Sequence, residues 1–207
     1  MKLLKHILFS LILFGFLSPA SPIVWAKNSE VAAAQQRVLQ VTQSIAHKLE
    51  VNKNQYSKNP ALLERMIRTE VLPFIDFDAM AKLTLGKHWR RATPAQRIRF
   101  VNAYREMLIR SYGKAMLKYA GASIRGSNST ADRKPGYVIV RTLVTPKGSA
   151  SIAANYNVRK KGNDWKAFNV QIGGINLITN FRTNFTREVS AKGLNALIAR
   201  LEKSNRK

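Results

Sequence analysis

Tyr137-Val-Ile-Val-Arg-Thr-Leu-Val-Thr145 is the stretch that decides the fold. It is rich in β-branched and apolar residues on both faces of an extended chain, which predicts a covered β-strand. Pro146-Lys-Gly148 follows as a turn, and Ser149 to Arg159 then alternates, with its apolar residues on one face. After a second turn, Lys160 to Asp164, the last strand runs from Trp165 to Ile172. Turns this short imply that neighbouring strands are antiparallel.

Two segments with helical periodicity precede this sheet. Glu30 to Leu49 has apolar residues at spacings of three and four, and Ala61 to Leu72 has a second apolar stripe of the same kind. We expect the polar stretch Asn52 to Pro60 to separate the two helices. Asp76-Phe77-Asp78 offers N-caps for a short third helix, Ala79 to Leu85.

The strongest helix start in the chain is Thr93-Pro-Ala-Gln96. Thr93 is the N-cap, the proline occupies the first helical position, and Gln96 completes a capping box. We expect this helix to run to about Tyr119, with an apolar stripe opposite arginine and lysine residues. Such a basic amphipathic helix either packs its apolar face in a core, which is the commoner case, or lies on a membrane surface. A short strand, Ser123 to Asn128, follows it.

Gly173-Gly174 leads the chain out of the last strand and into a helix that reaches Val189. Gly193 marks a break before a final helix, Leu194 to Leu201, and we expect the basic tail beyond it to be frayed. Helices, then strands joined by short turns, then helices are typical of an α+β fold. The sequence therefore predicts a twisted antiparallel sheet of about four strands packed against helices, with an N-terminal helical part and a C-terminal helix.

The N-terminus has the order of regions seen in a secretory signal peptide. A basic segment, Met1 to His6, is followed by an uncharged apolar run, Ile7 to Leu17, and Val24-Trp-Ala26 is a suitable cleavage site. A membrane anchor is the alternative, but the run has about half of the roughly 20 residues that a spanning helix needs. We therefore predict a signal peptide at 1–26 and an exported domain at 27–207, divided into a mainly helical part, 27–92, and a part with the long helix, the sheet and the C-terminal helix, 93–207.

Positive charge is the most unusual property of the composition. The 207 residues include 35 Lys and Arg against 11 Asp and Glu, a formal net charge of +24. Signal cleavage would remove Lys2 and Lys5 and leave +22. A chain this basic is attracted to nucleic acid, an anionic membrane surface or an acidic partner protein, and export makes nucleic acid the least suitable of these. The chain has no cysteine, which excludes disulfides, thiol catalysis and cysteine-ligated metals.

Few residues are candidates for catalysis. After signal removal the histidines are His47 and His88, which lie on separate segments and belong to no metal-ligand spacing, so we interpret them as surface or capping residues. Asp76 and Asp78 are a close carboxylate pair, but their position before a helix favours capping over acid–base catalysis. The sequence thus predicts a protein that is not an enzyme and that holds no metal or cofactor.

Three stretches, taken together, resemble one known family. Their order and spacing, over about Val31 to Leu201, are similar to those of the MlaC family, also called the toluene-tolerance family. The residues that carry the resemblance are Val71 to Ala81 with Leu85-Gly-Lys-His-Trp89; Ala92 to Arg97 with Phe100 and Tyr112-Gly113; and Trp165 to Val170 with Gly174-Ile-Asn-Leu-Ile178, Phe185, Gly193 and Leu201.

The resemblance implies a soluble periplasmic phospholipid-binding protein of an ABC transport system. Such a carrier would move phospholipid between an outer-membrane lipoprotein complex and the substrate-binding ring of an inner-membrane ABC transporter, which maintains outer-membrane lipid asymmetry. It would hold acyl chains in an apolar cavity between sheet and helices, touch membranes transiently and bind no nucleic acid. This chain departs from the family at one corner, where Phe168-Asn169 replaces the usual Tyr-Asp and Gly173-Gly-Ile-Asn176 replaces Glu-Gly-Val-Ser.

The lining of such a cavity is predicted from apolar residues of the helices and the sheet. Periodicity alone favours a filled core, and the resemblance shifts the interpretation to a cavity. Along the last strand, Phe168 and Val170 are expected on the sheet face opposite Trp165 and Ala167. The predicted lipid-binding residues are Phe74, Leu85, Tyr104, Leu108, Tyr112, Ile139, Leu143, Ile152, Tyr156, Phe168, Val170, Ile175 and Ile178.

Two other functions are considered beside lipid carriage. An exported binder of polyanions or of an anionic membrane surface rests on charge alone, and it predicts clustered basic residues with exposed aromatic residues between them. A small enzyme on a cone-shaped α+β scaffold needs a polar pair inside its pocket, and the sequence offers no convincing one. For a lipid carrier, we expect the positive charge to steer the protein toward anionic headgroups and acidic partner surfaces.

Overall fold

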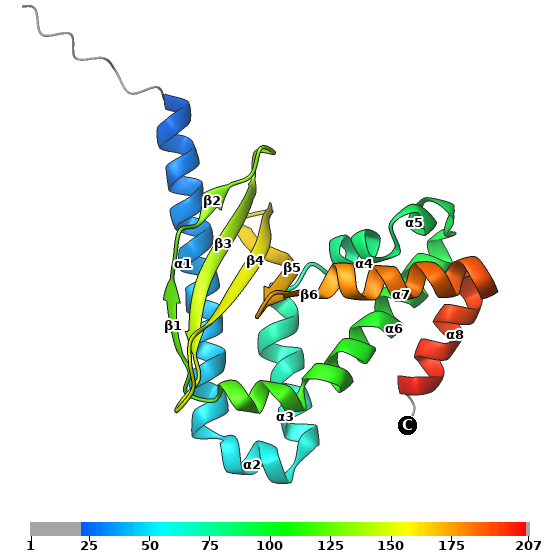
Figure 1. Cartoon of the computed structure of the whole chain (residues 1–207), viewed down its shortest axis with the longest axis horizontal. Helices are drawn as coiled ribbons and strands as arrows, with labels where there is room; N and C mark the ends of the chain where they lie inside the picture. The colour runs from blue at the N-terminus through cyan, green and yellow to red at the C-terminus, as the bar shows by residue number, and fades with distance from the viewer. Residues whose placement is uncertain (1–21, 206–207) are drawn as a thin grey trace, which may run out of the picture.

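The computed structural model describes residues 22–205, with side chains from Asn28 onward. Most of the predicted signal peptide therefore lies outside the described residues. A long helix runs beside a twisted antiparallel sheet, and a group of helices extends from one end of that sheet (Figure 1). The predicted α+β class is confirmed, although the sheet has six strands rather than about four. No helix within residues 22–205 is long and apolar enough to cross a membrane.

The strands follow the order β1-β3-β4-β5-β6, with β2 beside β3, and all pairs are antiparallel. The three long strands lie close to their predicted positions, because alternation and short turns are local signals. The two-residue strands are too short to leave a periodic pattern. The bounds are β1 (Ser123–Gly126), β2 (Thr130–Ala131), β3 (Tyr137–Thr145), β4 (Ile152–Lys161), β5 (Asp164–Ile172) and β6 (Ile175–Asn176).

Helix α1 (Pro22–Val51) covers one face of the sheet, which we call the inner face. Ala34 and Val38 of α1 are fully buried in a cluster with Val138 and Val140 of β3. The opposite, outer face is less well covered, and Leu143 on that face is 40% exposed. The prediction that β3 is covered on both faces is therefore wrong, and its apolar outer residues are only partly shielded.

A β-bulge interrupts the pairing of β4 with β5. Val158 pairs with Ala167 and Asn157 pairs with Asn169, so Phe168 has no partner of its own. The Asn169 amide nitrogen donates to the Asn157 side-chain oxygen at 3.2 Å, which places both side chains on the outer face. An extra residue of this kind shifts the alternation of every residue that follows it along the strand.

The bulge brings both ends of β5 to the inner face. Trp165 and Ala167 pack in the cluster that α1 covers. Val170 also points inward, because the extra residue of the bulge moves it to the same face as Trp165 and Ala167. The ring of Phe168 points outward and meets that of Tyr137, with ring centroids 5.7 Å apart. The prediction that Phe168 and Val170 share a face is therefore wrong for Val170, since alternation alone cannot reveal a bulge.

The segment between α1 and the long helix contains more structure than the periodicity predicts. The predicted break at 52–60 holds a short helix, and the predicted helix at 61–72 ends in a π-helical and a 3-10 turn. Asp76 caps the next helix as predicted, since its carboxylate accepts from the Ala79 amide at 3.2 Å. The bounds are α2 (Lys53–Lys58), α3 (Pro60–Met66), η1 (Ile67–Val71), η2 (Leu72–Phe74), α4 (Phe77–Leu85) and α5 (Lys87–Arg91).

The long helix, α6 (Pro94–Tyr112), begins with the predicted capping box. The Gln96 amide donates to the Thr93 hydroxyl at 3.2 Å, and the Thr93 amide donates to the Gln96 side chain at 2.9 Å. The helix ends earlier than predicted, and a 3-10 helix, η3 (Lys114–Tyr119), continues it. Two further helices, α7 (Leu177–Lys192) and α8 (Leu194–Asn205), close the chain, and α8 includes residues that were predicted to fray.

Candidate functional site

An apolar cavity of about 280 Å³ lies between the inner face of the sheet and the surrounding helices. Its helical wall comes from the second halves of α1 and α6, from η1, η2 and η3, and from the first residues of α4 and α7. Its sheet wall comes from strands β1, β3, β4 and β5. Major lining residues are Ile45, Leu49, Ile67, Val71, Leu108, Ile109, Tyr112 and Met116 on the helical side, and Ile124, Val144, Ile152, Ala154, Tyr156, Val170 and Ile172 on the sheet side.

Adjacent strands present the sheet wall in register. Tyr156 pairs with Val170, and Ala154 pairs with Ile172, so these four side chains share the inner face of β4 and β5. Ala154 lies in a cluster with Ala46 of α1, and both positions carry only a methyl group. Small residues at this point keep the helix and the sheet from filling the space between them.

The few polar groups of the lining are neutral. The Thr42 hydroxyl donates to the Val38 carbonyl at 2.7 Å and is therefore satisfied within α1. Burial raises the pKa of Tyr156 to about 12, so its phenol stays protonated at neutral pH. Every lining residue that the structure describes is uncharged. Tyr112 is 39% exposed, so the lining reaches the protein surface at that residue.

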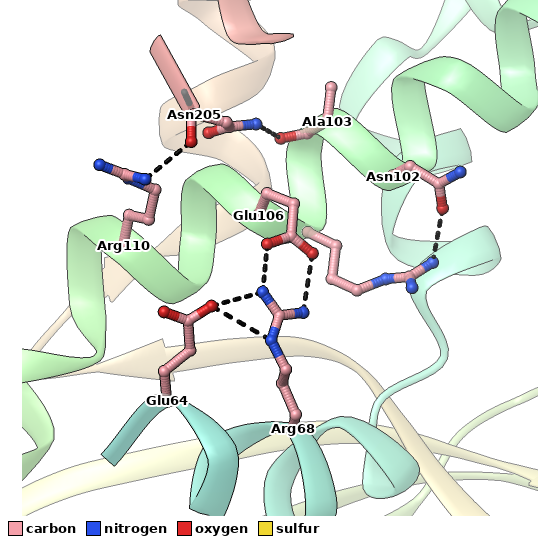
Figure 2. Close-up of polar contacts among 8 residues, drawn as sticks. Glu64, Arg68, Asn102, Ala103, Glu106, Arg110 and Asn205 are labelled. Carbon is pink, nitrogen blue, oxygen red and sulfur yellow. Dashed lines mark hydrogen bonds and ion pairs between the residues drawn. The ribbon is translucent and has the colours of Figure 1, made fainter. Parts of the chain in front are cut away.

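Two segments of the helical wall are joined by a network of ion pairs outside the cavity (Figure 2). Arg68, on η1, donates to Glu106 of α6 at 2.8 Å and to Glu64 of α3 at 3.1 Å. The Arg68 hydrogen bond lowers the pKa of Glu106 and so keeps that carboxylate charged. This network therefore links η1 to α6 through the Arg68 and Glu106 side chains.

The close approach of these two segments also depends on a glycine. A side-chain carbon at Gly113, just after α6, would lie 2.9 Å from the end of the Ile67 side chain. That carbon would also lie 2.5 Å from the Ile109 carbonyl oxygen, so a larger residue would require the Ile67 side chain and the end of α6 to shift. Gly113 therefore permits the helical wall to close on this side of the cavity.

Six of the thirteen predicted site residues line the cavity, and they come from both layers of the fold. They are Phe74, Leu108, Tyr112, Ile152, Tyr156 and Val170. Phe74, Tyr112 and Val170 belong to stretches that carry the resemblance. The structure thus brings together predicted residues that lie as much as 96 positions apart in the chain.

Three other predicted residues belong to a separate core. Leu85, Tyr104 and Ile178 are buried where α4, α6, α7 and α8 meet. Tyr104 is stacked on Phe100, its hydroxyl lies 3.3 Å from that of Thr84, and burial raises its pKa to about 12. The first half of α6 thus packs in a filled core, and only its second half faces the cavity.

The remaining four predicted residues lie away from the cavity on the sheet. Ile139, Leu143 and Phe168 lie on the outer face, because each directly follows or precedes a residue whose side chain points to the inner face. Ile175 is 62% exposed on the short strand β6.

Some lining residues were absent from the prediction. Ile45 and Leu49 belong to the apolar stripe of α1, so their periodicity was visible but their position opposite the sheet was not. Ile67 and Val71 likewise belong to the apolar stripe predicted over 61–72, but the π-helical turn η1 that contains them has no periodic signal of its own.

Two of the residues considered for catalytic or metal chemistry, Asp76 and His88, are buried. Within residues 22–205, no three histidine or acidic side chains are grouped so as to hold a metal ion. Asp76 is fully buried and paired with Arg159 and Lys161 besides capping α4. His88, predicted at the surface or as a cap, is instead only 9% exposed.

Known proteins are similar to this chain in sequence. The chain is 31% identical to a toluene tolerance protein of Pseudomonas putida over 146 residues, which cover 70% of this chain and 67% of that protein. It is 20% identical over 159 residues to a protein of Haemophilus influenzae named as the binding protein MlaC of an intermembrane phospholipid transport system, covering 75% of this chain and 74% of that one.

A solved structure has the same fold. It is the phospholipid-binding protein from Ralstonia solanacearum in complex with a phospholipid, with a TM-score of 0.75 and 23% sequence identity. The match covers 83% of this chain and 96% of that one. A sequence model of the MlaC protein family matches residues 39–203, which include every residue that lines the cavity. The chain therefore belongs to the MlaC family.

Proposed function

We propose that this protein binds phospholipid by its acyl chains and carries it through the periplasm. The observation that carries the proposal is the uncharged cavity, walled by apolar side chains from both the sheet and the helices. The names of two relatives support it, since one belongs to an intermembrane phospholipid transport system and the other is a phospholipid complex. The carrier would exchange lipid between an outer-membrane lipoprotein complex and the substrate-binding ring of an inner-membrane ABC transporter.

The energetics favour recognition of the acyl chains over the headgroup. Each CH₂ group removed from water contributes about 0.8 kcal/mol, so even part of an acyl chain offsets the roughly 4–15 kcal/mol cost of association. A cavity without charged lining offers the headgroup no specific partner, and we expect weak headgroup selectivity. The proposed lipid contacts are the predicted residues that line the cavity: Phe74, Leu108, Tyr112, Ile152, Tyr156 and Val170.

The distribution of charge suits a carrier that visits anionic surfaces. Eight of the eleven acidic side chains take part in ion pairs within the protein, for example Glu106 with Arg68 and Glu188 with Arg200. The large excess of basic side chains therefore has no internal counter-charge and faces solvent. Such a surface speeds encounters with anionic headgroups and acidic partner proteins.

Lipid extraction and lipid transfer test the proposal. Protein purified from the periplasm should yield phospholipid by mass spectrometry after solvent extraction, and it should move labelled phospholipid between donor and acceptor vesicles. Occupancy should persist in high salt, because apolar burial is not screened, whereas a polyanion binder would lose its ligand there. Recovery of no phospholipid, together with no transfer, would refute lipid carriage.

A further inference from the structure

A second depression, of about 450 Å³, lies at the end of the helical part that is farthest from the sheet. It is bounded by α5, by the start of α6 and by residues on both sides of the α7–α8 junction, which lie together in Figure 1. Its polar lining consists of Lys87, His88, Arg91, Gln96 and Ser190. No acidic residue lines it, so this depression is basic where the lipid cavity is uncharged.

The cations of this depression have no counter-charge in the described chain. Neither Lys87 nor Arg91 forms an ion pair among residues 28–205, and most acidic residues are paired with other basic side chains. The two residues are four positions apart on α5, a spacing at which like charges repel. The Gln96 side chain is hydrogen-bonded to Thr93 and Asn195, and therefore does not occupy the donors of Lys87 and Arg91.

His88 gives a second, independent indication. The residue is only 9% exposed, and its ring Nε2 is buried without a hydrogen-bond partner in the described chain. Burial, with a further contribution from Lys87 and Arg91, lowers the pKa of this imidazole. A buried polar atom without a partner is uncommon, and this one belongs to a residue that lines the depression.

We propose that this depression binds an oxyanion of the phosphate class, either free phosphate or the phosphate of a lipid headgroup. Arg91 supplies a planar fork of donors that matches phosphate oxygens, and Lys87 supplies a second positive charge. Ser190 adds a hydroxyl donor, and a bound anion favours the protonated imidazole of His88. The site is separate from the apolar cavity, so it does not depend on lipid being held there.

The test follows the imidazole signals by proton NMR while inorganic phosphate is added to the purified protein at constant ionic strength. The pH is held constant below about 6.5, the ordinary pKa of histidine, because the pKa of His88 is lowered. The His88 signals, assigned with His88→Gln, should shift and saturate, while those of the exposed His47 stay in place. Lys87→Gln with Arg91→Gln should weaken phosphate binding at least tenfold. Lys53→Gln with Arg65→Gln removes the same charge from α2 and α3 and should change it less than twofold.

Three results would overturn the proposal: a shift that does not saturate, a shift that chloride alone produces, or unchanged affinity in the Lys87→Gln, Arg91→Gln variant. Both substituted side chains are exposed, so the variant should fold, and Arg91→Gln alone provides a milder version.

Vesicles identify the source of the phosphate group. If the site takes lipid headgroups, phosphate should compete with phosphatidylglycerol vesicles for the protein, and the α5 variant should bind those vesicles more weakly than its charge-matched control. If the site takes free phosphate, both variants should bind vesicles equally while only the α5 variant loses the NMR shift. Either pattern supports an oxyanion site.

Discussion

A single carboxylate, placed on one face of β4 or the other, tests the cavity directly. Ile152 lines the cavity, whereas the next residue, Ala153, is exposed on the outer face. Ile152→Asp and Ala153→Asp therefore introduce the same charge one residue apart on opposite faces. Only Ile152→Asp should interfere with bound acyl chains, because only that carboxylate would lose its water when lipid enters.

The size of the effect follows from the protonation of the introduced carboxyl. Its pKa in water is about 3.9, so neutralising it at about pH 7 costs roughly 4 kcal/mol. Lipid affinity should fall by about a thousandfold, since each 1.4 kcal/mol is a factor of about ten. Acidification should restore about tenfold of the affinity per pH unit down to about pH 4, because the group is then already neutral.

Displacement of a fluorescent phospholipid analogue at several pH values measures this loss and its recovery. Circular dichroism checks that both variants are folded, and Ala153→Asp should bind lipid within twofold of the unmodified protein at every pH. The reasoning is refuted if Ile152→Asp binds within threefold of the unmodified protein at neutral pH, or if both variants lose affinity equally.

Three further outcomes are expected. Leu85→Ala should lower the unfolding free energy by about 2–5 kcal/mol in urea titrations while lipid affinity stays within twofold; a selective loss of affinity would place Leu85 in the site instead. Arg68→Met should speed lipid release in stopped-flow experiments, with a stability loss of about 1 kcal/mol or less because the ion pairs are partly exposed, and Arg65→Met should not. The Arg200 hydrogen bond lowers the pKa of Glu188, so this ion pair stabilises the fold at pH values above the ordinary carboxylate pKa and stops doing so on acidification. Glu188→Gln should therefore make the unfolding free energy fall less steeply between neutral and acidic pH. An unaltered pH profile would contradict this.

Local signals explain which elements the sequence predicts well. The turns around β3 to β5 and the capping box of α6 involve residues within a few positions of one another, so the pattern contains them in full. The end of α6 is different. The apolar stripe continues past Gly113 at helical spacing, so the pattern does not show where the α-helix gives way to the 3-10 helix η3. The π-helical turn η1, within the helix predicted at 61–72, is hidden for the same reason.

The site is predicted in part because periodicity identifies a buried face but not what lies opposite that face. Tyr104 and Leu108 belong to the same stripe of α6, yet Tyr104 meets α7 in a filled core and Leu108 faces the cavity. The sequence also leaves the inner face of β3 undecided, because both of its faces are apolar. From the sequence, Leu143 and Val144 are therefore equally suitable as lining residues. In the structure, Val144 pairs with Ile152, and both line the cavity from the inner face.

The bulge in β5 means that the number of residues in this strand matters as much as their kind. Phe168 has no partner in β4, so a chain that lacked only this residue would keep Trp165, Ala167, Val170 and Ile172 on one side through simple alternation. Regular pairing of β5 without the bulge, and without deletion of a residue, would instead turn Gln171 toward the inner face. A polar side chain would then line the apolar cavity. Loss of Phe168 would therefore leave the inner face of β5 with the same residues, whereas a shift of the bulge along the strand would change which side chains face the cavity while the sequence stays the same.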